Sequence, residues 1–187
     1  MSKADFDLVF DALKSTLETY AAAQVSPYGF TVLADRFRDL PADSSAVIVM
    51  LHMGTVSAME QTVHGNMKLS VPYNLDMIVK ARGEKDGAAF TNANEAAGAR
   101  IRYLYGQLIE ALFPSGNYRL GMAAGTIAEK RLDSITPLLP EEIGERGFAA
   151  ARMVITISTQ WEPTPVTGTD IDSISVTADK WSALISP

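Results

Sequence analysis

Apolar residues recur along the chain with two periods, and each period predicts a different kind of element. Steps of three and four residues predict a helix over 4–23. Its apolar face comprises Phe6, Val9, Phe10, Leu13, Leu17 and Tyr20. A second helix is predicted from the N-cap Asn92 to about Phe113, because Glu95 completes a capping box. Its apolar stripe comprises Ala93, Ala97, Ile101, Leu104, Leu108 and Leu112. Gly98 and Gly106 each cost about 1 kcal/mol relative to Ala, and we expect close backbone packing against a sheet to compensate.

Strict alternation predicts strands elsewhere. Every odd position over 67–81 is apolar, and most even positions are polar. Pro72 cannot donate to a ladder, so it marks an edge, a bulge or a break between two shorter strands. The stretch 149–160 predicts a strand with one apolar face, and the uncharged stretch 46–53 predicts a buried one. The apolar face over 149–160 comprises Ala151, Met153, Ile155 and Ile157.

The remaining segments are less regular. Residues 30–45 fit either a short strand or a surface loop, and 118–123 predict a short strand. Gly83 to Gly87 predict a turn. The stretch 125–140, which contains Pro137 and Pro140, predicts an irregular loop. Residues 170–177 fit a last short strand or an arm.

The order of elements is helix, strands, long helix, strands. This order predicts an α+β fold, with a mostly antiparallel sheet and two helices on one of its faces. We expect one domain over 1–161 and a C-terminal extension over 162–187 without a core of its own.

Composition excludes several classes of function. The 187 residues include no Cys, which excludes disulfides, thiolate metal sites and a Cys nucleophile. A formal net charge of −6 argues against a general nucleic-acid-binding surface. No stretch resembles a signal peptide or a membrane-spanning helix, so we expect a soluble protein made inside the cell.

Catalytic motifs are missing from the sequence. It contains no GxGxxG after a strand, no phosphate-binding P-loop and no GxSxG elbow. His52 and His64 are the only histidines, and their spacing does not suit a metal site. We expect His52 to be structural and His64 to lie in a solvated turn. We therefore expect no enzyme, no metal and no cofactor.

The chain resembles the phage tail terminator, or tail completion, family and related head–tail connection proteins. The resemblance is one of pattern over most of the chain. It rests on the N-terminal helix FDLVFDALKSTLETY, the alternating strand YNLDMIVKARGE and the Ala-rich helix ANEAAGARIRYLYGQLIEALF. The segment YRLGMAAGTIAEKRLDSITPLLP, expected as short strand and loop, and the late strand ARMVITISTQWEP complete it.

The resemblance implies a structural protein of the virion tail. Its subunits would form a ring, typically of six, that caps the head-proximal end of the tail tube and stops tube polymerisation. The tail tube protein and the head connector protein would be its partners. DNA would pass through the ring without sequence-specific binding, which suits an acidic protein because like charge repels phosphate.

Polar loops and the aromatic residues near the C-terminus are the candidate interface. The candidates are Gly83, Glu84, Lys85, Asp86, Gly87, Ile127, Trp161 and Trp181. The extension 162–187 fits either an arm that packs on a neighbouring subunit or a plain surface extension. Two other functions stay open. One is a non-enzymatic binding or adaptor module, and the other is a small enzyme built on Glu95, Glu110 and His52.

Overall fold

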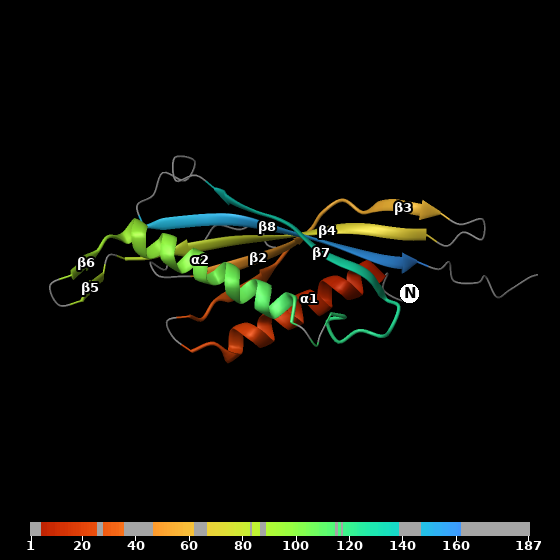
Figure 1. Ribbon diagram of the computed structural model, residues 1–187, viewed down its shortest axis with the longest axis horizontal. Coiled ribbons are helices and arrows are strands. Elements are labelled where there is room, and N and C mark those ends of the chain that lie inside the picture. Colours follow the sequence, from red (N-terminus) through yellow and green to blue (C-terminus); the bar gives the residue numbers. More distant parts are fainter. Residues whose placement is uncertain are drawn as a thin grey trace, which may run out of the picture.

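The computed structural model describes residues 5–25, 28–35, 47–61, 67–82, 84–86, 89–114, 116, 118–138 and 147–161. Two helices pack on a six-stranded sheet, so the fold is α+β as predicted (Figure 1). The helices are α1 (Asp5–Ala23) and α2 (Ala93–Leu112). The sheet contains β1 (Thr31–Ala34), β2 (Val47–Met53), β3 (Ser57–Gln61), β4 (Met67–Lys80), β7 (Ile127–Leu138) and β8 (Phe148–Trp161). A separate two-stranded sheet pairs β5 (Glu84–Asp86) with β6 (Ala89–Thr91).

The long pair of β4 and β8 forms the middle of the sheet. The strands run antiparallel in unbroken register from Met67 opposite Trp161 to Lys80 opposite Phe148. The strand order is β1-β2-β4-β8-β7, and β3 also pairs with β4. Every pair is antiparallel except β1 with β2, which is parallel. The predicted strands over 46–53, 67–81 and 149–160 are thus confirmed.

Pro72 lies at the point where β4 changes partner. β2 pairs with β4 as far as Met53 opposite Tyr73, and β3 takes over from Ser57 opposite Ser70. The Gly54 N–H donates to the Pro72 carbonyl at 2.7 Å. The N–H and C=O of one strand residue point to the same side. The missing Pro72 N–H therefore faces this gap, and the ladder to β8 loses nothing. The break is in the partner strand and not in β4.

Both helices cover the same face of the sheet (Figure 1). One apolar cluster joins Val9, Leu13 and Leu17 of α1 with Ala97, Ile101, Leu104, Leu108 and Leu112 of α2, and with Val71, Leu75, Met77, Met153, Ile155 and Ile157 of the sheet. The fully buried Tyr73 links the layers further, because its hydroxyl donates to the Phe6 carbonyl of α1 at 2.8 Å. The predicted faces of both helices and of both long strands are confirmed.

The start of α2 confirms the predicted capping box. The Glu95 N–H donates to Asn92 Oδ1 at 2.9 Å, and the Asn92 N–H donates to Glu95 Oε2 at 3.4 Å. The prediction for the helix glycines is wrong. A Cβ on Gly106 would have nothing within 4 Å, and one on Gly98 would meet only the tip of Arg102. The sheet therefore does not compensate for either glycine, since both lie away from it.

Gly147 joins three elements just before β8. Its N–H donates to Asn94 Oδ1 of α2 at 2.7 Å, and its carbonyl accepts from the Ala81 N–H after β4 at 2.8 Å. Its φ is +74°, and a Cβ there would overlap the Ala81 carbonyl oxygen. Only glycine fits this position without displacing the backbone after β4.

Three predictions for the irregular segments are wrong. The stretch expected as a loop over 125–140 contains the twelve-residue strand β7. The expected strand over 118–123 is a series of turns, in which Leu120 is buried with a positive φ of 54°. Glu84–Asp86, expected in a turn, form β5. The residues of β7 and β5 lack an alternation of apolar and polar positions, whereas 118–123 have one, with Tyr118, Leu120 and Met122 at alternate positions, and still form turns.

Two ambiguous segments have different outcomes. Within 30–45, Thr31–Ala34 form the short strand β1, so the strand alternative holds there, and 36–46 lie outside the described residues. Residues 170–177 and the rest of 162–187 also lie outside them.

We predict opposite effects for Ala at two glycines. Gly54→Ala places a Cβ 2.8 Å from Pro72 Cγ and 2.9 Å from its carbonyl oxygen, so it lowers the free energy of unfolding by about 1–3 kcal/mol. Gly106→Ala, the control, meets no neighbouring atom within 4 Å and raises it by up to about 1 kcal/mol. Urea unfolding measures both. An unchanged free energy of unfolding in Gly54→Ala would contradict the close approach of Gly54 to Pro72.

Candidate assembly interface

The strand β7 forms one edge of the sheet. Among the described residues it pairs only with β8, from Ile127 opposite Thr159 to Leu138 opposite Ala150. On its other side, alternate residues point their backbone N–H and C=O groups away from β8, and the Lys130 N–H is already bonded to the Tyr118 hydroxyl. Such an edge is a template for another strand. Two irregularities in register, after Ile127 and after Leu132, together with Pro137, limit the partner to a short strand.

The two faces of β7 differ in polarity. On the side of the helices, Leu132 and Ile135 are half-buried and pack against the core. On the helix-free side, the Arg131 Nε donates to Asp133 Oδ1 at 2.6 Å, and the Thr156 hydroxyl of β8 donates to the same carboxylate. Partial burial alone would raise the pKa of Asp133, but hydrogen bonds from Thr156 and Arg131 hold it below its usual value. The carboxylate is therefore charged and fixed.

Lys130 anchors β7 to the end of α2. Its side chain is 6% exposed, and its ammonium donates to the Leu112 carbonyl in the last turn of the helix. The ammonium also lies 5.1 Å from the ring centres of both Phe113 and Tyr118. The Lys130 backbone N–H donates to the Tyr118 hydroxyl at 2.6 Å. Burial lowers the pKa of Lys130 to about 8.

The geometry around Lys130 suits a structural cation. A cation at a helix C-terminus neutralises the partial negative charge of the last carbonyls, and the two rings supply a cation–π surface. The amine is enclosed by its own chain, so no small-molecule carbonyl can approach it. No local pattern indicated this lysine, because 125–140 was expected as a loop. The buried anchor fixes the edge of β7 in place.

A polar cluster occupies the helix-free face of the sheet. Arg152 donates to both oxygens of the Asp76 carboxylate, at 2.6 and 2.8 Å. The hydrogen bond that Arg152 donates to Asp76, together with the negative charge of that carboxylate, raises the pKa of Arg152. His52 Nε2 lies 4.0 Å from the same carboxylate. His52 therefore lies beside this cross-strand ion pair. His64 lies outside the described residues.

The three residues of the enzyme alternative do not meet. His52 lies on the helix-free face, because Leu51 beside it points into the helix-side core. Glu95 belongs to the capping box of α2. Glu110 lies near the other end of that helix, about 22 Å away at 1.5 Å per residue, and accepts a hydrogen bond from Tyr20 at 2.7 Å. Burial and this bond raise the pKa of Tyr20 to about 12.

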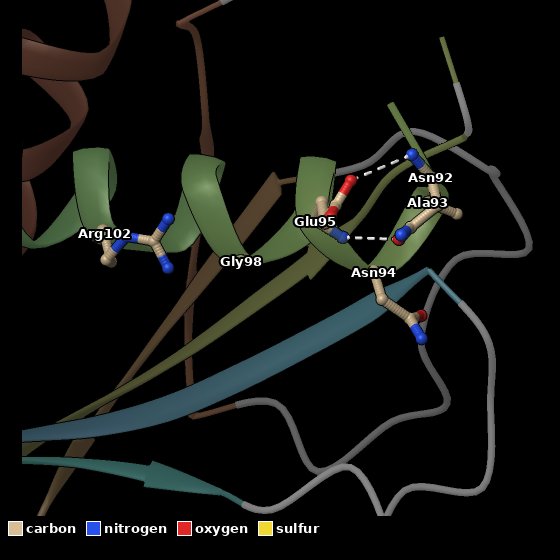
Figure 2. Close-up of a pocket in the computed structure, with 6 residues that line it drawn as sticks. All are labelled: Asn92, Ala93, Asn94, Glu95, Gly98 and Arg102. Carbon is tan, nitrogen blue, oxygen red and sulfur yellow. Dashed lines mark hydrogen bonds between the residues drawn. The ribbon is translucent and has the colours of Figure 1, made fainter. Parts of the chain in front are cut away.

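An open depression of about 680 Å³ surrounds the start of α2 (Figure 2). Its polar groups are used within the protein: Asn92 and Glu95 bind each other, and Asn94 accepts from Gly147. Arg102 lies further along the helix (Figure 2). The lining residues are Asn92, Ala93, Asn94, Glu95, Gly98 and Arg102. These groups serve the helix start and do not converge on a ligand.

The structure describes only some of the predicted interface residues. Glu84, Lys85 and Asp86 form β5, which lies beside β6 at one end of the molecule (Figure 1). Trp161 ends β8 opposite Met67. Ile127 begins β7 and is 6% exposed, so it packs in the core and is not available to a partner. Gly83, Gly87 and Trp181 lie outside the described residues.

Comparison with known proteins leaves the family open. No family model matches the chain, and no curated protein matches it. Within the described ranges, no group of His, Asp and Glu could hold a metal ion. In that same part of the chain, no helix is long and apolar enough to cross a membrane.

We predict that Lys130 makes stability depend on pH. The folded protein releases the Lys130 proton near pH 8, whereas the unfolded chain does so near 10.5. In between, the unfolded chain binds more protons, so the free energy of unfolding rises with pH by up to about 1.4 kcal/mol per unit. Lys130→Met removes this rise. Denaturant titrations from about pH 7.5 to about 9.5 measure it.

The control is Lys14→Met, which changes an exposed lysine on α1. We expect this variant to keep the rise of the free energy of unfolding with pH. The range stops below pH 10 because burial raises the pKa of both Tyr20 and Tyr73. Those tyrosines lower stability as pH rises above 10. If the free energy of unfolding rose equally with pH in the unchanged protein and in Lys130→Met, Lys130 would not be the source of the pH dependence.

Proposed function

We propose that this protein is a structural component of a phage tail that acts as a tail terminator. In this proposal its copies form a ring, six being the typical number, at the head-proximal end of the tail tube. The ring stops tube polymerisation and presents a surface to the head connector. Its action is stoichiometric rather than catalytic, and it needs no cofactor.

The observation that carries the proposal is the unlike pair of edges of the sheet. The twelve-residue strand β7 forms one edge, while the four-residue β1 and the five-residue β3 lie toward the other. A closed ring needs two different surfaces that join head to tail, since a single self-complementary surface gives only a dimer. A sheet with two unlike edges supplies such surfaces, and both helices lie on one face of that sheet (Figure 1).

Two further features support the proposal. The order of elements on which the resemblance rests, a helix, a long alternating strand, an Ala-rich helix and a late strand, recurs as α1, β4, α2 and β8. The net charge of −6 also suits a ring through which DNA passes, because an acidic lumen does not retain phosphate. Strand edges that accept another strand offer a direct way to contact the last ring of a tube.

We predict that the purified protein forms a ring and caps tail tubes. Six chains of 20.2 kDa give a native mass of about 120 kDa, which mass photometry over a dilution series measures. Added to polymerising tube protein, the chain shortens the tubes in proportion to its concentration and appears at their ends in electron micrographs. An equal amount of bovine serum albumin is the control. A monomer that leaves tube length unchanged at high concentration would overturn the proposal.

A further inference from the structure

The edge of β7 can accept a further strand, and the chain itself has a segment that fits. We propose that residues 170–177 of one copy add a strand to the β7 edge of a neighbouring copy. The inference deepens the proposed ring by naming the contact between its subunits. It rests on the ring and not on the tail tube, so the two can fail separately.

The apolar pattern of residues 170–177 matches the polarity of β7. Within this segment, residues 173–177 alternate: Ile174 and Val176 are apolar, and Ser173, Ser175 and Thr177 flank them, whereas Ile171 and Asp172 do not follow the alternation. A strand with this alternation has one apolar and one polar face. Ile135 on the helix side of β7 is only half-buried, so Ile174 would cover it as a cross-strand neighbour. Val176 would lie on the same face, toward the half-buried Leu132. The serines would then join Ser134 and Thr136 on the helix-free side.

The length of the two strands also agrees. The register of β7 with β8 is regular from Ser134 to Leu138 and irregular before it. A partner strand that follows this stretch needs only about five residues, and the alternating residues 173–177 supply five. Pro137 removes one donor and discourages longer or unrelated strands.

The point where the extension begins favours a neighbouring copy over the same copy. Twenty-six residues follow Trp161, which lies at the end of the sheet where β7 starts, because Ile127 pairs with Thr159. To reach β7 of its own copy, the chain would reverse direction and run parallel to β7. Pro163 and Pro165 occupy that stretch, and prolines favour an extended linker over a reversal. Eight linker residues reach up to about 28 Å when extended, which is several times the spacing of about 4.8 Å between neighbouring strands.

Disulfide trapping tests the inference directly, because the chain has no Cys of its own. Ser134 on β7 is exposed on the helix-free side, and Ser175 is on the face of the arm predicted to join it. The full-length double variant Ser134→Cys/Ser175→Cys is oxidised at low concentration and run on a denaturing gel without reductant. We expect a ladder of covalent multimers up to the ring, which reductant collapses to the monomer. The single variants, as controls, give at most dimers.

Two other results would overturn the inference. A fast-migrating monomer with a closed disulfide would show that the arm packs on its own β7. A second double variant, Thr136→Cys/Ser173→Cys, covers the neighbouring pair of positions in the same register. A ring that forms no disulfide in either double variant would show that other surfaces join the copies.

A matched charge pair provides an independent test in the full chain. Ile174→Asp/Val176→Asp puts two carboxylates against the apolar side of β7. Because two buried charges are costly, we expect this ring to dissociate at a protein concentration at least about 100-fold higher than the ring of the unchanged protein. Ser173→Asp/Ser175→Asp adds the same charge on the opposite face and leaves assembly within about threefold of the unchanged protein, because exposed charges cost little. Equal effects of the two double variants would overturn the inference. A ring joined by residues 170–177 on the neighbouring β7 that does not cap tail tubes would instead overturn the proposed tail function alone.

Discussion

The pairing of β4 with β8 is the constraint on which the rest of the structure depends. Fourteen residue pairs in unbroken register place the apolar positions of both strands on one face. A shift of one residue would turn every one of those side chains to the opposite face. Gly147 fixes the register at one end, because its backbone bonds hold the start of β8 to Ala81 and to Asn94. The helices, the partner change at Pro72 and the position of β7 all follow from this pair.

Elements that bury one face could be predicted from the sequence, and those that do not were largely missed. Both long helices and the strands β2, β4 and β8 have apolar residues at the spacing that burial requires. In β7 most residues from Arg131 onward are exposed, so no alternation distinguishes it from a loop. The turns around Leu120 and the positive φ of Gly147 depend on contacts with distant elements, which a local pattern does not contain.

The position of the candidate interface could not be predicted from the sequence. Polar loops and C-terminal aromatic residues were expected to form the interface, yet Ile127 lies in the core and the strand edge that begins with it was assigned to a loop. Lys130 could not be recognised as an anchor, since its role depends on the Leu112 carbonyl, Phe113 and Tyr118 meeting around it. An isolated lysine between glutamate and arginine gives no local sign of burial. The residues that hold an edge in place are thus harder to infer than those that fill a core.

The separation of the central strands along the chain has a consequence for synthesis. Residues paired between β4 and β8 are between 68 positions apart, at Lys80 and Phe148, and 94 positions apart, at Met67 and Trp161. Contacts this distant form slowly, because a long loop must close first. On the ribosome, β4 emerges well before its main partner, and β8 is the last described strand to be made. The nascent chain therefore exposes one side of β4 until β8 has been made, and this interval is when aggregation competes most strongly with folding.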